Sequence, residues 1–280
     1  MNLPSEYEFE TGDANDRGLS EATEFLRRCL SSQTDTVQHY LWRDDQVWAK
    51  RAVAARPRWH FWLLGLLASA VGLPALAPVH NPGGEHSVRT EARRLRELAS
   101  RGLRVPAVLA ELPGGFLMEH LGRPGQPTPS LAEEMNEHTR ADPQRVLALF
   151  RQGLQATARV HAVGTCLSQG FARNLVRCPD GVVGYVDFED DPQATMSLAQ
   201  CQLRDILCYL HSSAVYLMEA GQLDAARAPW REWLSARTPT LQLLVADSAR
   251  RMRWLRHLPQ DRRLGRDLQR ARAAWALLEG

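Results

Sequence analysis

Two residues of metal-binding type flank a short predicted hairpin in the second half of the chain. Asn174 comes just before its first strand and Asp187 just after its second, with a Pro-Asp-Gly turn at residues 179–181 between them. Antiparallel strands joined by a tight turn bring their outer ends together, so both side chains can face one small volume. An amide oxygen and a carboxylate suit Mg²⁺, which also takes phosphate oxygens and water. The pattern therefore predicts a magnesium site.

Lys50 is the only lysine in the chain, and the other 33 of its 34 basic residues are arginine. Lysine carries a compact ammonium on a flexible stem, whereas arginine carries a planar fork, so a site that needs the first does not readily accept the second. Lys50 lies within a predicted strand, residues 47–53. A helix predicted for residues 90–101 places Glu91 on the same face as Leu95 and Leu98.

The remaining elements divide the chain into two parts. Residues 1–121 are predicted to hold an acidic lead-in, a short helix at 20–30, and strands at 37–42, 47–53, 105–112 and 116–120 around the helix at 90–101. The Pro/Gly-rich segment 122–129 begins the second part, residues 122–280, as a linker. Beyond the linker the pattern is helical, interrupted only around the loop and hairpin at 161–191. The order predicts an α+β chain with two lobes.

These motifs, in this order, resemble those of the protein-kinase-like superfamily. Residues 168–174 (Ser-Gln-Gly-Phe-Ala-Arg-Asn) and 184–189 (Gly-Tyr-Val-Asp-Phe-Glu) resemble its catalytic loop and its metal-binding Asp-Phe-Gly or Asp-Phe-Glu triplet. Residues 47–50 (Val-Trp-Ala-Lys) are similar to its Val-Ala-Ile-Lys strand. The His-Ala-Val-Gly at 161–164 and the Arg-Asp pair at 204–205 look most like the bacterial lipopolysaccharide (Kdo/heptose) kinase family.

The resemblance covers roughly residues 34–215 and implies a two-lobed protein-kinase-like fold. That fold has a small strand-rich N-lobe with one main helix and a larger helical C-lobe. The implied activity is transfer of the γ-phosphoryl group of ATP, with Mg²⁺, to a hydroxyl acceptor. The implied roles are phosphate binding by Lys50, orientation of that lysine by Glu91, Mg²⁺ binding by Asn174 and Asp187, an adenine-facing hinge at Glu119, and support of the catalytic loop by Asp205.

The chain departs from the family pattern at the catalytic aspartate. That residue is expected five positions before Asn174, where this chain has Gln169. A glutamine amide can contact and position the acceptor hydroxyl but cannot take its proton. Glu189, Asp190 or Asp191 are the alternatives for a base, and Arg173 can add positive charge near the transferring group.

A second departure concerns the loop that should cover the phosphates. Residues 31–36 (Ser-Ser-Gln-Thr-Asp-Thr) occupy its place without a glycine, which restricts close backbone approach. The hydroxyls of Thr34 and Thr36 are the expected phosphate contacts there. Both departures leave open an alternative function, a nucleotide-binding pseudokinase with a regulatory or scaffold role.

Composition favours a cytoplasmic protein. The five cysteines form no Cys-x-x-Cys pair, so neither a disulfide framework nor a zinc site is predicted. The first 25 residues carry seven acids against Arg17 and show no apolar run, so no secretory signal is expected. The net charge of +2 implies no general polyelectrolyte role.

Residues 59–79 contain no charged side chain apart from the titratable His60, over a length that matches a membrane span. Lys50 and Glu91 flank this segment and must meet in one site, which argues against a single crossing. Basic residues before it and tryptophans at its start suit anionic headgroups, whereas burial in the protein core is the equal alternative. Membrane contact would place the protein at the inner membrane with a lipid-linked or sugar-lipid acceptor.

The C-terminal residues 250–272 carry nine arginines against Asp261 and Asp267. Such a segment suits an anionic surface, although a solvated helix face is the simpler and favoured explanation. A membrane-surface or nucleic-acid binding module driven by these arginines is therefore a further alternative, of which the nucleic-acid version is the less favoured.

Overall fold

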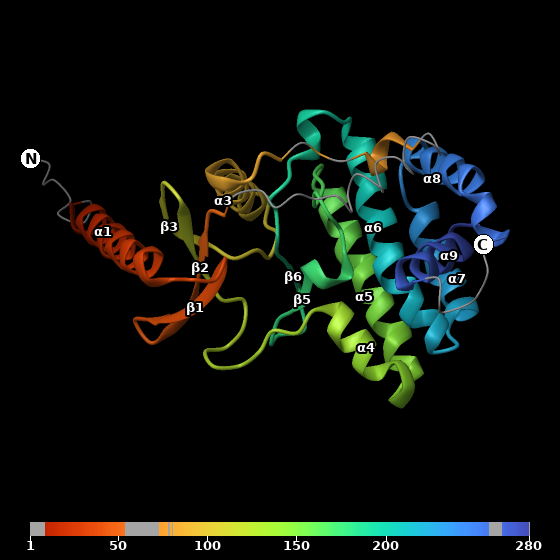
Figure 1. Cartoon of the computed structure of the whole chain (residues 1–280), viewed down its shortest axis with the longest axis horizontal. Helices are drawn as coiled ribbons and strands as arrows, with labels where there is room; N and C mark the ends of the chain where they lie inside the picture. Colours follow the sequence, from red (N-terminus) through yellow and green to blue (C-terminus); the bar gives the residue numbers. More distant parts are fainter. Residues whose placement is uncertain (1–8, 54–72, 78, 80, 258–264, 280) are drawn as a thin grey trace, which may run out of the picture.

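In the computed structural model, which describes residues 9–53, 73–77, 79, 81–257 and 265–279, an antiparallel sheet forms the N-terminal part (Figure 1). Its four strands lie in the order β1-β2-β4-β3. They are β1 (Val37–Trp42), β2 (Asp45–Arg51), β3 (Val108–Leu112) and β4 (Gly115–Glu119). Arg43 and Asp44 join β1 to β2 with φ of 52° and 67°, as a two-residue hairpin turn requires. The strands expected at 37–42 and 47–53 imply a turn between them, and the structure has one at this place.

The two faces of the sheet have different partners. Helix α1 (Phe9–Ser32) covers one face, where Val47, Ala49 and Leu117 are buried with Leu26 of the helix. Successive strand residues point to opposite faces, so Lys50 projects from the other face. Helix α3 (Gly84–Ser100) lies on that second side, towards the helical part (Figure 1). The sheet thus positions the single lysine between itself and the rest of the molecule.

Both N-terminal helices begin earlier than the sequence indicates. The short helix expected at 20–30 runs from Phe9 to Ser32, and the helix expected at 90–101 runs from Gly84 to Ser100. Gly12 and Gly18 lower the helical propensity of the first.

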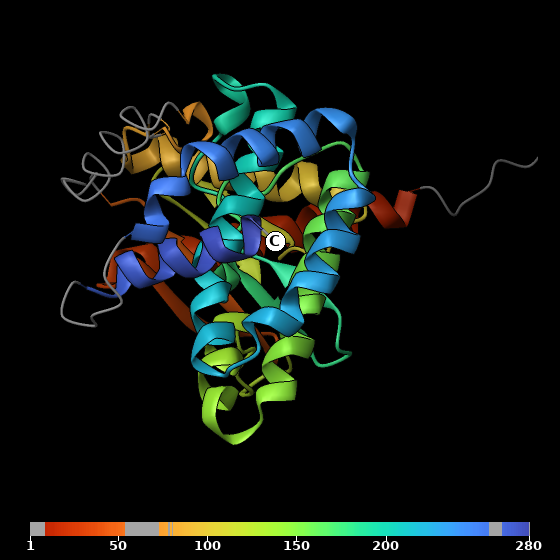
Figure 2. The same cartoon turned by 90° about the vertical axis from the view of Figure 1, so that its right-hand side faces the viewer.

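The larger C-terminal part is mostly helical and shares one extensive core with α3. Phe150, Tyr209 and Trp230 are among its largest buried side chains. Figures 1 and 2 show α9 running beside α6, which lies at the centre of this part. The helices are α4 (Leu131–Ala141), α5 (Pro143–Ala162), α6 (Leu198–Glu219), α7 (Leu223–Ser235), α8 (Pro239–Arg251) and α9 (Arg266–Leu278), with short 3₁₀ turns η1 (Pro74–Leu76), η2 (Ala172–Asn174), η3 (Pro192–Ala194) and η4 (Arg253–His257).

The predicted hairpin is confirmed as strands β5 (Leu175–Arg177) and β6 (Val183–Tyr185). Tyr185 at the end of β6 is buried, and its hydroxyl donates to the Ala156 carbonyl of α5 at 2.9 Å. The chain is therefore an α+β protein in which an antiparallel four-stranded sheet with a helix precedes a larger, mostly helical region.

The apolar segment 59–79 lies mostly outside the described residues, which include 73–77 and 79. Leu73 and Ala75 are buried, and Arg204 of α6 donates to the carbonyls of Ala75 at 2.9 Å and Ala77 at 2.8 Å. This end of the segment therefore packs against α6. Within the described ranges, no helix is both long and apolar enough to cross a bilayer.

Candidate functional site

A buried ion pair joins the sheet to α3. The Lys50 Nζ lies 2.5 Å from Glu91 Oε2, and the two residues are only 6% and 2% exposed. Lys50 comes from β2, and Glu91 comes from the second turn of α3. The predicted partnership of these two residues is therefore present in the geometry.

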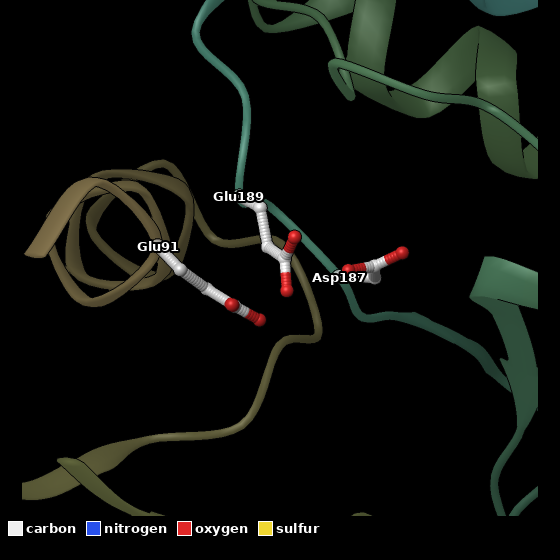
Figure 3. A group of neighbouring side chains, drawn as sticks. All are labelled: Glu91, Asp187 and Glu189. Atoms are coloured by element: carbon white, nitrogen blue, oxygen red, sulfur yellow. The ribbon is translucent and has the colours of Figure 1, made fainter. Parts of the chain in front are cut away.

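Two further carboxylates reach the same ammonium from the segment after β6. Glu189 Oε1 lies 2.8 Å from Lys50 Nζ, and Asp187 Oδ1 lies at 3.9 Å. Figure 3 shows Glu91 and Glu189 facing each other from opposite segments, with Asp187 beside them. Oxygens of the three carboxylates lie within 4.8 Å of one another. Asp187 has a φ of 71°, a conformation that aspartate tolerates better than most residues.

This cluster contains more acidic than basic side chains. Burial lowers the pKa of Lys50, but Glu91, Glu189 and Asp187 more than offset that effect, so the net pKa is raised and the ammonium is stabilised. Burial raises the pKa of Glu91 and of Asp187, and Lys50 opposes both shifts. Three carboxylates share one ammonium, so the four groups carry a net charge of −2. A divalent cation near Asp187 would relieve this repulsion.

Asn174 lies next to Asp187, as the hairpin predicts. The Val186 N–H donates to the Asn174 carbonyl at 3.1 Å, which ties the entry of the hairpin to its exit. The Asn174 side chain is buried, and its Nδ2 donates to the Gln169 carbonyl at 3.1 Å. That bond leaves Oδ1 as the atom available to a cation. The donor set of Asn174 and Asp187 therefore suits Mg²⁺ chemically.

Gln169 is held against an acidic side chain. Its Nε2 donates to Asp190 Oδ2 at 2.5 Å, and Asn81 Nδ2 donates to Asp190 Oδ1 at 2.9 Å. Asp190 is 4% exposed. Of the three carboxylates considered as a replacement base, Asp190 is the one beside Gln169, because Glu189 pairs with Lys50 and Asp191 pairs with Arg93.

The loop that carries Gln169 rests on α6 through Asp205. The fully buried Asp205 Oδ2 accepts from the Leu167 N–H at 2.8 Å, and His161 Nε2 lies 3.4 Å from the same oxygen. A Cβ on Gly170 would lie 2.5 Å from the Asp205 carbonyl oxygen. The expected support role of Asp205 thus has a structural basis in these contacts.

A cleft of about 870 Å³ opens beside Lys50, Glu91 and Asp187. Glu119, at the end of β4, lies on its wall, but the Glu119 N–H already donates to the Ala107 carbonyl at 3.0 Å. A hydrogen bond donated to adenine at this hinge must therefore come from another group. Apolar side chains that suit a planar base line the same cleft, namely Val37, Trp48, Met118, Val176 and Val186.

The structure does not bring the expected phosphate-covering residues to this cleft. Ser31 and Ser32 complete α1, and Gln33 is buried with its Nε2 donating to the Ala49 carbonyl at 3.2 Å. Thr34 is exposed, and neither Thr34 nor Thr36 is among the residues that line the cleft. The proposed hydroxyl contacts to phosphate stay a prediction that this arrangement does not support.

Arg173 occupies the predicted position beside Asn174 but points to a neighbouring pocket. It is exposed, its guanidinium stacks 4.2 Å from the centroid of the Phe171 ring, and it lines a cavity on the helical side. It still lies close enough to Asp187 for its charge to favour the ionised carboxylate.

Sequence reasoning missed three features of the site. The pairing of Glu189 with Lys50 depends on the turn at Asp187, the contact between Gln169 and Asp190 crosses two loops, and Asn81 comes from a distant segment. The Asp-Phe-Glu triplet was the sequence signal for Glu189, because its third position holds a carboxylate where the triplet more often has glycine.

The arrangement combines an ammonium, an amide and several carboxylates at the edge of a partly apolar cleft. Such a site can bind a nucleotide with a divalent cation and can position a hydroxyl near Gln169 and Asp190. No protein-family model matches the chain, and the search of curated proteins finds no relative.

Proposed function

We propose that the chain is a phosphotransferase with a two-lobed protein-kinase-like fold that moves the γ-phosphoryl group of ATP to a hydroxyl acceptor. Its N-lobe is the sheet with α1 and α3, and its C-lobe is the helical part from residue 122. Lys50 holds nucleotide phosphates, Glu91 orients Lys50, and Asn174 and Asp187 hold Mg²⁺. The metal supplies charge neutralisation for the transferring phosphoryl group.

One observation carries the proposal. Lys50 from β2, Glu91 from α3 and Asp187 from the segment after β6 converge on one cleft, with Asn174 tied to the same segment. Phosphoryl transfer depends mainly on positioning and electrostatic stabilisation, which such a convergence provides. Gln169 then contacts the acceptor hydroxyl, and Asp190 beside it is the carboxylate placed to receive the proton.

The acceptor class is proposed from the sequence resemblance. A lipopolysaccharide, another sugar-lipid or a further membrane-associated hydroxyl compound fits the family that the motifs resemble, in a cytoplasmic protein at the inner membrane. The C-terminal arginines suit the anionic character of such a substrate.

A nucleotide-binding pseudokinase is the second candidate function. The observation that favours it is the pairing of Gln169 with Asp190, since the amides of Gln169 and Asn81 already occupy that carboxylate and compete with the acceptor hydroxyl for it. The absence of Thr34 and Thr36 from the described cleft wall also weakens the grip on phosphates.

Two measurements separate these functions. ATP with Mg²⁺ should raise the melting temperature of the chain, and EDTA should remove the effect. Incubation with γ-labelled ATP and a lipopolysaccharide or protein pool should transfer the label, and Lys50→Met and Asp187→Asn should each abolish transfer. Nucleotide stabilisation without any transfer would favour the pseudokinase.

A further inference from the structure

A second cavity of about 470 Å³ lies beside the nucleotide cleft, on the helical side of the molecule. Three guanidinium groups line it, Arg173 from η2 and Arg266 and Arg270 from the first two turns of α9. Figures 1 and 2 show α9 against α6, the helix that supplies Tyr216 to the same cavity. The cavity adjoins the cleft, because both are lined by Thr128, Glu133 and Val176.

The charge in this cavity is strongly positive. Among its described lining residues, the one carboxylate is Glu133. Its Oε2 accepts from the Ser130 N–H at 2.8 Å and from the Ser130 hydroxyl at 2.9 Å, in the capping box that begins α4. Three arginines therefore face one carboxylate that a helix cap already uses.

The hydrogen-bond donors of these arginines are only partly used. Arg270 Nη1 bonds to Asp267 at 3.0 Å, but its Nε is buried without a hydrogen-bond partner among the described residues. Arg266 reaches Glu219 only at 3.9 Å. Within the described part of the chain, Arg173 has no carboxylate at ion-pair distance. A buried donor without a partner is unfavourable, so an acceptor oxygen from a ligand would be favourable here.

Phosphate suits this arrangement better than a carboxylate does. Arginine forks bind phosphate through pairs of parallel hydrogen bonds, and a phosphate group presents enough oxygens for three forks that approach from two elements. A carboxylate offers only two oxygens.

We infer that Arg173, Arg266 and Arg270 form a phosphate-binding subsite for the acceptor. The acceptor then carries a phosphate group in addition to the hydroxyl that receives the γ-phosphoryl group. This step rests on the proposed function, and the adjacency of Arg173 and Asn174 places the subsite next to the proposed metal site.

Calorimetric titration with inorganic phosphate, at constant ionic strength, tests the subsite without any phosphoryl transfer. Arg270→Gln should weaken phosphate binding at least tenfold. Arg250→Gln is the matched control, because Arg250 also pairs with an aspartate three residues earlier on its own helix but does not line the cavity.

Two results would overturn the inference: equal weakening by Arg270→Gln and Arg250→Gln, or no phosphate binding by the whole chain. Arg266→Gln, at a side chain that is half exposed, provides a second variant if Arg270→Gln fails to fold, and it should also weaken binding. Failure of the proposed function would instead appear as loss of label transfer with phosphate binding intact.

Two further ligands identify the source of the phosphate. Binding of glycerol 3-phosphate that depends on Arg270 would indicate a soluble phosphorylated acceptor. Binding to phosphatidylcholine vesicles that contain phosphatidic acid, but not to phosphatidylcholine alone, would indicate a lipid one if Arg270→Gln reduces it. Binding of either ligand that is insensitive to Arg270→Gln would contradict the subsite.

Discussion

Lys50 Nζ lies 2.5 Å from Glu91 Oε2, although 41 positions of the chain separate the two residues. The same nitrogen lies 2.8 Å from Glu189, so one ammonium connects the sheet, α3 and the segment after β6. The chain keeps a lysine here and nowhere else, and a rigid guanidinium would not reach three separate carboxylates in the same way. The Lys50 ammonium therefore links the N-terminal part to the segment after β6 through Glu189, besides pairing with Glu91 within the N-terminal part.

Lys50→Met should destabilise the protein by about 3–5 kcal/mol. Removing one partner of a buried ion pair leaves an uncompensated buried charge, and here three carboxylates lose their shared cation. Urea denaturation at pH 7 would measure the loss of unfolding free energy.

The double variant Lys50→Met/Glu91→Met supplies the control for this effect. It replaces the pair by two apolar side chains of similar length, so it should be more stable than Lys50→Met alone. An unchanged unfolding free energy in Lys50→Met would show that the ion pair does not couple the two parts.

Local sequence patterns predicted those parts of the fold that depend on local chemistry. The turn at Arg43–Asp44, the hairpin around Asn174 and Asp187, and the strand that holds Lys50 all follow from residue type and alternation. The start of α3 was placed too late, because Gly84 is a weak helix former, whereas Ser87 and Val88 of the same first turns are buried in the fold.

The sequence predicted which residues form the candidate site but not the long-range contacts between them. The motifs indicated which residues should meet, but the approach of Glu189 to Lys50 depends on a backbone turn with positive φ at Asp187. Two of these contacts join segments that lie about 100 residues apart in the chain. Asn81 contacts Asp190, and Arg173 lines the same cavity as Arg270. Periodicity does not report such contacts.

Asp187→Asn should make the ligand-free protein more stable at pH 8 while it abolishes Mg²⁺-dependent nucleotide binding. Burial and Glu189 raise the pKa of Asp187, with Lys50 opposing, so the folded state binds this proton more tightly than the unfolded state. Stability then falls as pH rises through the raised pKa. Asparagine removes that penalty and also tolerates a φ of 71°.

Thermal unfolding measured at several pH values would test the sign of this stability change. The variant should melt about 1–3 °C above the parent chain at pH 8, and the difference should disappear below about pH 4, where aspartate is protonated in both states. A variant that is less stable than the parent at pH 8 would show that Asp187 is stabilised, not strained, by its surroundings.

Gly170→Ala should displace the loop that carries Gln169 from α6. Its Cβ would lie 2.5 Å from the Asp205 carbonyl oxygen, and that backbone cannot yield easily because Asp205 is fully buried. Overpacking of this kind costs about 1–3 kcal/mol, and the displacement of Gln169 should also reduce nucleotide stabilisation. Gly18→Ala in α1 is the control, because no atom lies within 4 Å of its added Cβ; it should stabilise the chain by up to about 1 kcal/mol. Equal stability changes in the two variants would contradict the close contact.

Asp190→Asn tests the carboxylate beside Gln169. If Asp190 receives the acceptor proton, label transfer should fall by about 10²–10⁴-fold, whereas ATP-dependent thermal stabilisation should persist because Lys50, Asn174 and Asp187 are untouched. Asp191→Asn provides a neighbouring control, since Asp191 pairs with Arg93 at 2.5 Å and not with Gln169. Its transfer rate should stay within about twofold of the parent rate, because the loss of a partly exposed ion pair has little energetic effect.

Gln169→Glu extends the same test by placing a second carboxylate against Asp190. The 2.5 Å hydrogen bond between Gln169 and Asp190 would become a repulsive contact unless the two groups share a proton. A shared proton would occupy Asp190 and prevent it from accepting the acceptor proton, so transfer by Gln169→Glu should require a higher pH than transfer by the parent chain. Full activity in Asp190→Asn, together with an unchanged pH profile in Gln169→Glu, would show that Asp190 does not accept the proton. Gln169 would then contribute only by positioning the acceptor.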